Sequence, residues 1–387
     1  MKFKKILTHT PWLYDHVRLT AFQKAIHEVI RKGDIVADIG TGCGILTFFA
    51  LQAGAQKVYA IEQDEGILEE AKRLAEVNKM AERTIFIKGS SDQIELPEKV
   101  DVVIRYDIGN FGINYDHKFI NCTVDFRKRY LKPKGLQVPS WLDLCLVPVA
   151  FEGYETEIHK SWTKDFFGLD FSLVGKSITS LVNVVDCSGK VKELAPVVTI
   201  ARLDLNMVDC IPPHFLGRWR TAEEGYFNGY AGYIRVGLSK NVILSTSWNN
   251  PSTHLQQVFF PLEESVKVEK GDWVDCKLTY VPRKEHAFWI WETNISRNGT
   301  TLSQFSQSNL DLMEIDKESI VMRQGSFVPV LSGEGEIYRE VMGLCDGHRT
   351  IEEIVRALLE KYPARYTDKE HALDGIYSIL RKKVQTK

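Results

Sequence analysis

The spacing of hydrophobic and polar residues changes along the chain, and this change predicts more than one domain. From about residue 16 to 150, short apolar runs alternate with longer segments rich in Glu, Lys, Ala and Leu. Such alternation is typical of an α/β unit whose sheet is mostly parallel. The predicted strands lie at 35–38, 58–61, 84–87 and 100–104. The clearest predicted helix lies at 65–79.

A different pattern occupies residues 137 to 305. Many short runs of β-branched and aromatic residues are separated there by Gly, Pro, Asn and Asp. This pattern predicts an antiparallel β domain, either a barrel or a sandwich. Residues 155–167 interrupt it with helical periodicity, which predicts an inserted amphipathic helix. The polar segment 300–315 predicts a linker.

A third, small unit is predicted beyond the linker. Thr350 is a favourable N-cap for one of its helices, and Glu353 completes a capping box. The expected elements are two short strands and then three helices, at 319–322, 326–331, 336–343, 351–361 and 369–383. The predicted domains are therefore three, at 1–136, 137–305 and 316–387.

Composition narrows the classes of function. The chain has 49 Lys and Arg against 51 Asp and Glu, which argues against nucleic-acid binding through a generally basic surface. Its seven cysteines include no Cys-x-x-Cys pair, so neither a disulfide framework nor a metal site is expected, and a reducing cytoplasmic location is predicted. No apolar run reaches secretory or membrane-spanning length, so no membrane association is expected.

A glycine-rich turn follows the first predicted strand. Asp38 ends this strand, and Gly40, Gly42 and Gly44 lead into the next helix. Glycines are needed there because the backbone must turn tightly and allow a ligand to lie against main-chain N–H groups. The turn predicts a Rossmann-like nucleotide site.

Polar residues at the next two strand ends extend this site. Glu62 ends the second strand at 62 − 40 = 22 residues from the first glycine, the spacing at which an acid meets ribose hydroxyls. Ser91 and Asp92 follow the third strand, where Asp92 is placed to accept from an adenine amino group. These residues suit either a dinucleotide oxidoreductase or a methyltransferase that uses S-adenosyl-L-methionine (SAM).

The segment before the first strand distinguishes the two. Residues 9–26 (HTPWLYDHVRLTAFQKAI) resemble the N-terminal helix of the protein arginine methyltransferases, which folds over bound SAM. His9, Asp15 and Arg18 fall on its functional positions, and a guanidinium suits the methionyl carboxylate of SAM. The resemblance implies that Glu62 binds the ribose, that Ser91 and Asp92 contact the adenine, and that S-adenosyl-L-homocysteine is the product.

The resemblance covers roughly residues 9 to 295. Residues 129–139 are similar to the family's helix-to-barrel crossing, and 158–171 to its dimerisation arm, which implies a homodimer. The segment 252–261 resembles the family's threonine-histidine-tryptophan loop, with Leu255 in the tryptophan place. In the family the loop histidine pairs with the N-terminal aspartate, which implies a contact between His254 and Asp15.

The sequence departs from the family where the acceptor is bound. The family holds the substrate guanidinium with two glutamates nine residues apart after the fourth strand. Aligned on Gly109, both glutamate positions hold tyrosine, Tyr106 and Tyr115, with 115 − 106 = 9. A one-residue slip places Asp107 and Asp116 at the same spacing, but it breaks the glycine match, so the tyrosine pair is preferred.

Tyrosines change the expected acceptor. Neutral hydroxyls bind a neutral amide but do not neutralise a buried guanidinium. A side-chain amide of Asn is therefore the expected acceptor, with Asp107, Asp116 or His254 as the base. Two other acceptors remain alternatives. Arginine is one, if the aspartates line the site, and a carboxylate is the other, because Arg105 is adjacent to Tyr106 in the sequence.

The third unit resembles a second family. Residues 341–359 (VMGLCDGHRTIEEIVRALL) closely resemble the PqqD-like domain, a winged-helix-type module that recognises the leader of ribosomally synthesised precursor peptides. The resemblance implies that a leader adds a strand beside 326–331 and packs on the helix at 373–381. The whole chain is then similar to the asparagine N-methyltransferases of proteusin pathways. The alternatives are a peptide arginine N-methyltransferase and an inactive scaffold that binds precursor peptide.

Overall fold

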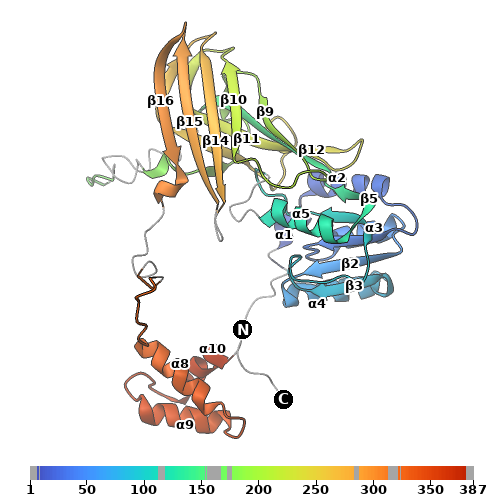
Figure 1. Cartoon of the computed structure of the whole chain (residues 1–387), viewed down its shortest axis with the longest axis vertical. Coiled ribbons are helices and arrows are strands. Elements are labelled where there is room, and N and C mark those ends of the chain that lie inside the picture. Colours follow the sequence, from blue (N-terminus) through green and yellow to red (C-terminus); the bar gives the residue numbers. More distant parts are fainter. Residues whose placement is uncertain are drawn as a thin grey trace. The chain divides into compact units, whose positions relative to one another are not determined.

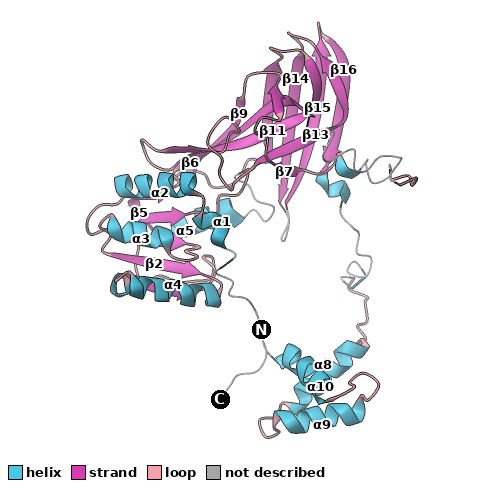
Figure 2. Cartoon of the chain, turned by 180° about the vertical axis from the view of Figure 1, so that it is seen from behind, coloured by secondary structure: helices cyan, strands magenta, loops and turns pink. Residues whose placement is uncertain are grey.

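The structure is a computed structural model of the chain that divides into two compact units, Met1–Met313 and Glu314–Lys387. Figures 1 and 2 show the elements of each unit from opposite sides. The residues that the structure describes are 7, 9–111, 118–152, 154, 167–171, 177–282, 287–312, 321–322 and 324–380.

The first unit begins with a parallel five-stranded sheet of order β3-β2-β1-β4-β5. The strands are β1 (Ile35–Ile39), β2 (Lys57–Glu62), β3 (Thr84–Lys88), β4 (Val100–Arg105) and β5 (Leu131–Val138). The first four confirm the predicted strands to within one residue at each end. The sequence missed β5, because its residues LKPKGLQV lack the apolar run of a buried parallel strand.

Helices cover both faces of this sheet. Neighbouring strand residues point to opposite faces, so Val36 and Val102 pack with Phe22 of α2 (His16–Val29), whereas Ala37 and Val103 pack with Phe126 of α5 (Lys118–Tyr130). The helices are α1 (Thr10–Leu13), α2 (His16–Val29), α3 (Ile45–Gln52), α4 (Glu65–Val77), the short 3₁₀ turn η2 (Ala81–Arg83) and α5 (Lys118–Tyr130).

Two of these helices have well-defined ends. Asp15 caps α2 by accepting from the backbone N–H of Arg18, and Asp64 caps α4 in the same way. The predicted helix at 65–79 ends at Val77 because Lys79 adopts a left-handed φ of 57°, which an α-helix does not accommodate. Within the described residues, no helix combines the length and the apolar character needed to cross a bilayer.

The second half of this unit confirms the predicted antiparallel β domain and consists of two sheets. One has the order β7-β13-β11-β6-β8, with β12 paired to β11 and β9 to β6, and the other has the order β10-β14-β15-β16. The strands are β6 (Trp141–Phe151), β7 (Asn183–Val185), β8 (Val191–Glu193), β9 (Val198–Asp204), β10 (His214–Arg220), β11 (Gly225–Gly237), β12 (Ile243–Ser245), β13 (Gln257–Val268), β14 (Trp273–Pro282), β15 (Ala287–Arg297) and β16 (Thr300–Ser308), followed by η5 (Asn309–Leu312).

The linker predicted at 300–315 is wrong over its first part. Residues 300–308 form β16, which pairs with β15 along its length (Figure 1). Ser, Thr and Gln suit an edge strand, whose outer face is solvated, and Phe305 packs on the core. The amphipathic helix predicted at 155–167 lies outside the described residues apart from Phe167, which is in a turn.

The parallel sheet and the β domain share one hydrophobic core. Phe111, in the segment after β4, is 4% exposed, and its ring centroid lies 5.8 Å from that of Phe260 and 5.9 Å from that of Trp289. A Cβ at Gly232 would lie 2.7 Å from the Phe111 ring, so glycine makes room for it. The loop that carries Tyr106 and Asp107 is thus anchored in the β domain.

The second unit contains α8 (Gly333–Leu344), α9 (Ile351–Lys361) and α10 (Lys369–Leu380), packed around Val341, Leu358 and Ile376. The predicted helices and the capping box of Thr350 and Glu353 are confirmed. The strand predicted at 326–331 is wrong, because these residues pair with no strand in the described part of the unit. Val328 and Val330 are 78% and 87% exposed there, and Pro329 has no N–H to donate. Of the other predicted strand, 321–322 are helical and 319–320 lie outside the described residues.

The Phe111 anchor gives a testable prediction. Phe111→Ala removes a buried ring and leaves a cavity, so the free energy of unfolding is expected to fall by about 3–5 kcal/mol in a denaturant titration followed by circular dichroism. Tyr226→Ala is the matched control, because this ring is 63% exposed and its loss is expected to change stability by less than about 0.5 kcal/mol. Equal effects of the two changes would contradict the anchor.

Candidate functional site

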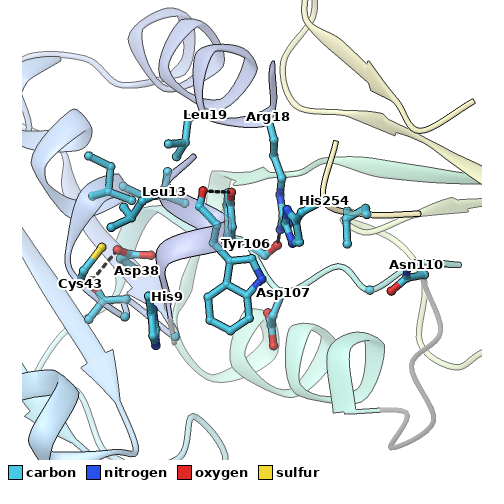
Figure 3. Close-up of a pocket in the computed structure, with 18 residues that line it drawn as sticks. His9, Leu13, Arg18, Leu19, Asp38, Cys43, Tyr106, Asp107, Asn110 and His254 are labelled. Carbon is cyan, nitrogen blue, oxygen red and sulfur yellow. Dashed lines mark hydrogen bonds between the residues drawn. The ribbon is translucent and has the colours of Figure 1, made fainter. Parts of the chain in front are cut away.

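A cavity of about 330 Å³ lies at the carboxyl edge of the parallel sheet. It lies beside the segments that follow β1 and β4, where the strand order reverses and where open α/β sheets bind their ligands. Its wall comes from the N-terminal segment, the glycine turn, the segment after β4 and a loop of the β domain (Figure 3). The lining residues are His9, Trp12, Leu13, Arg18, Leu19, Asp38, Gly40, Thr41, Gly42, Cys43, Ile45, Leu46, Tyr106, Asp107, Gly109, Asn110, His254 and Leu255.

Three residues form a hydrogen-bonded chain on one side of the cavity. His254 Nδ1 lies 2.7 Å from Asp15 Oδ2, so the contact implied by the sequence is present. Because the Asp15 carboxylate only accepts, Nδ1 carries a proton and donates it to Asp15. Arg18 Nη1 lies 2.8 Å from His254 Nε2 and 3.4 Å from Nδ1, so the guanidinium lies against the imidazole ring.

Burial shifts the pKa values of Arg18 and Asp15 in this hydrogen-bonded group. Arg18 is 1% exposed, and burial lowers the pKa of its guanidinium to about 10, although Tyr106 and Asp15 oppose the shift. Burial alone would raise the pKa of Asp15, but hydrogen bonds from His254 and from the backbone of Arg18 bring it below its ordinary value. Near neutral pH, Arg18 is a cation and Asp15 an anion.

The glycine turn forms the opposite side of the cavity. Gly40, Gly42 and Gly44 have φ values of 70°, 55° and 88°, the left-handed region that favours glycine. Asp38 Oδ2 accepts from the hydroxyls of Thr41 and Thr47 at 2.8 and 2.7 Å. Asp38 Oδ1 has no hydrogen-bond partner among the described atoms, and burial raises the pKa of this carboxyl to about 6. A buried acceptor thus remains available beside the cavity.

Several predicted cofactor residues are not part of the cavity wall. Glu62 is buried at the end of β2 and accepts from the backbone N–H groups of Gly42 at 3.1 Å and of Asp64 at 2.9 Å. Ser91 is also buried, whereas Asp92 is exposed. Gly44, the N-cap of α3, is not among the lining residues.

The structure describes one residue of each predicted acceptor pair, Tyr106 of the tyrosine pair and Asp107 of the aspartate pair. The Tyr106 ring stacks on Arg18, with 3.3 Å between the guanidinium carbon and the ring centroid. Burial raises the pKa of Tyr106 to about 12, so its phenol is neutral. Asp107 also lines the cavity, whereas Tyr115 and Asp116 lie outside the described residues.

The sequence analysis missed Trp12 as a wall residue. Its ring lies 4.7 Å from that of His9 and 6.2 Å from that of His254, centroid to centroid, so it packs between two predicted site residues. The available signal was an aromatic residue within the same N-terminal segment as His9 and Arg18. Among the described residues, no group of three or more His, Cys, Asp or Glu side chains is arranged to hold a metal ion.

Comparisons with known proteins show similarity to methyltransferases. The family described as ribosomal protein L11 methyltransferase (PrmA) matches residues 20–108, and the arginine methyltransferase oligomerization subdomain matches residues 143–291. The histone-arginine methyltransferase CARMER of Drosophila persimilis is 31% identical over 319 residues, which are 78% of this chain and 58% of that protein. The chain thus spans a little over half the length of the curated relatives that it matches.

Solved structures show the same fold. The Trypanosoma brucei PRMT1 enzyme-prozyme complex with AdoHcy superposes with a TM-score of 0.70 at 21% identity, covering 78% of this chain and 96% of that one. Protein arginine methyltransferase 10 of Arabidopsis thaliana gives 0.67 at 23% identity, covering 79% and 97%. This chain therefore has the fold of the protein arginine methyltransferases, a Rossmann-like parallel sheet joined to an antiparallel β domain.

The link between Asp15 and His254 is testable. Asp15→Ala removes both the cap of α2 and the acceptor of two His254 N–H groups, so we expect the free energy of unfolding to fall by about 2–4 kcal/mol. Asp64→Ala removes a comparable cap on α4 and leaves His254 untouched, so it is expected to cost about 1 kcal/mol in the same denaturant titration. If both variants lose the same stability, the contact with His254 does not stabilise the fold.

The buried carboxyl of Asp38 predicts a pH dependence. Its folded-state pKa of about 6 exceeds the ordinary value of 3.8, so its contribution to stability is full below pH 4 and is lost as pH rises through 6. Relative to Asp38→Asn, the wild-type unfolding free energy is expected to fall by about 2 kcal/mol between pH 4 and pH 7. Denaturant titrations at a series of pH values measure this difference, and parallel curves for the two proteins would contradict the buried anion.

Proposed function

We propose that the chain is a SAM-dependent N-methyltransferase of the arginine methyltransferase type, acting on side chains of a peptide or protein. The observation that carries the proposal is the cavity, which brings a buried cationic Arg18 opposite a glycine turn at the carboxyl edge of the sheet. The related Trypanosoma brucei complex contains AdoHcy, the product of a SAM-dependent transfer.

The described residues fit SAM. Arg18 supplies donors for its carboxylate, and Asp38 Oδ1, which has no described partner, supplies an acceptor for its ammonium group. Glu62 stands at the end of β2 for the ribose, and the predicted adenine contacts are Ser91 and Asp92. Bound SAM supplies a methyl group activated by its sulfonium.

The chain's own residues position this chemistry. Asp15 and His254 fix the orientation of Arg18, and Trp12 and His9 cover the cavity from the N-terminal segment. Both described candidate bases already have an arginine partner, His254 with Arg18 and Asp107 with Arg105. Asp107 is the more exposed of the two, at 58% of its side chain against 20% for His254, so we assign it the proton of the acceptor nitrogen.

Two acceptors are candidates, and arginine is the first because the matching curated relatives are histone-arginine methyltransferases. The second is the side-chain amide of Asn in a ribosomal precursor peptide. It is supported by the neutral phenol of Tyr106, which takes the place of the first family glutamate, and by the resemblance of the C-terminal unit to leader-binding modules. A homodimer is supported by the match to the oligomerization subdomain. The predicted domain boundaries and cytoplasmic location remain part of this proposal.

Two measurements test the proposal. Calorimetric titration with SAM is expected to show binding that Arg18→Ala weakens at least about tenfold, because a charge-assisted hydrogen bond is lost. Arg83→Ala is the control, because Arg83 contacts backbone carbonyls of Leu51 and Ala55 away from the cavity.

The second measurement is tandem mass spectrometry of peptides that contain both Arg and Asn, incubated with isotopically labelled SAM. Methyl groups on Arg would support the first acceptor, and methyl groups on Asn the second. Absence of heat with SAM would instead favour the inactive scaffold and refute the proposed activity.

A further inference from the structure

A buried guanidinium outside the cavity is paired with a carboxylate of the cavity wall. Arg105 ends β4, and its side chain is 7% exposed. Its Nε donates to Asp107 Oδ1 at 2.6 Å and its Nη2 donates to Asp107 Oδ2 at 2.9 Å, a bidentate ion pair. The carboxylate that the sequence offered as an acceptor ligand is therefore already occupied by an arginine of the same chain.

Arg105 is buried in this position. Its guanidinium lies 5.2 Å from the ring centroid of Phe119, which is 1% exposed. Burial alone would lower the pKa of Arg105, but Asp107 holds it above its ordinary value, so the charge persists at every physiological pH. Asp107 thus faces the cavity as one half of an ion pair.

The pair changes the electrostatics of this side of the cavity. Figure 3 shows Asp107 beside Tyr106, with Asn110 farther along the same segment and Arg18 near His254. Tyr106 is a neutral phenol and Asn110 a neutral amide. With Asp107 neutralised by Arg105, the segment after β4 presents no uncompensated anion among its described residues.

We propose that Arg105 is a positioning residue that sets the charge preference of the acceptor site: by holding Asp107 in a bidentate pair, it disfavours a cationic acceptor relative to a neutral one of the same shape. This inference rests on the proposed function, because it concerns the acceptor of the same cavity. Without Arg105, the full charge of Asp107 would attract a guanidinium but not a neutral urea.

The test compares two labelled peptides that differ only in charge. Each carries three Gly-Gly-Xaa-Gly repeats and fluorescein, with Xaa either arginine or citrulline, its neutral isostere. Affinities for the full-length protein are measured by fluorescence anisotropy in excess S-adenosyl-L-homocysteine, so that methyl transfer is not required. The readout is the ratio of the arginine affinity to the citrulline affinity, which general damage to the fold does not shift.

Three variants are expected to move this ratio differently. Arg105→Gln frees the carboxylate and is expected to raise the ratio about tenfold. Asp107→Asn leaves Arg105 as an unpaired cation and is expected to lower it, and the double variant is expected to return it close to the wild-type value. Arg297→Gln is the matched control, because it breaks a bidentate pair with Asp272 in the β domain, and it is expected to leave the ratio unchanged.

The outcomes separate this inference from the proposed function. A ratio within about twofold of wild type in both Arg105→Gln and Asp107→Asn, or a failure of every protein to bind either peptide, overturns the inference. Methyl transfer by a protein whose ratio does not respond to these changes overturns the inference alone. A shifted ratio in a protein that transfers no methyl group supports the inference and refutes the proposed function.

Discussion

The site depends on one contact between residues 239 positions apart, the hydrogen bond between Asp15 and His254. Asp15 starts α2 as its cap, and His254 lies in a loop of the β domain. The same imidazole also contacts Arg18, so the N-terminal helix and the β domain together set the orientation of the cofactor-facing guanidinium. Neither domain alone would fix a buried cation in this position, since burial without partners is costly.

Two buried arginines affect the charge of the cavity, each on a different part of its wall. Arg18 lines it and stacks on Tyr106, whereas Arg105 lies behind the wall and occupies Asp107. Both cations are compensated by partners within the chain, which explains how they are tolerated at 1% and 6% exposure. On the opposite side, Asp38 Oδ1 is a buried acceptor without a described partner.

The sequence predicted β1 to β4 because buried parallel strands are short, continuous apolar runs bounded by turns. It failed at β5 and β16, where polar residues occupy strands whose pairing depends on a neighbour distant from the local pattern. The strand expected at 326–331 failed for the opposite reason, because a β-branched pattern without a pairing partner in the described unit does not form a strand.

The chemistry of the residues was determined by the sequence itself: the glycine turn, the acid at the end of β2, the N-terminal arginine and the absence of glutamates at 106 and 115. These follow from residue type and spacing, which are local properties. Only the tertiary structure decided that His254 holds Arg18 and that Arg105 neutralises Asp107. Such pairings depend on burial and on the directions of side chains from packed elements, and these directions do not exist until the chain has folded.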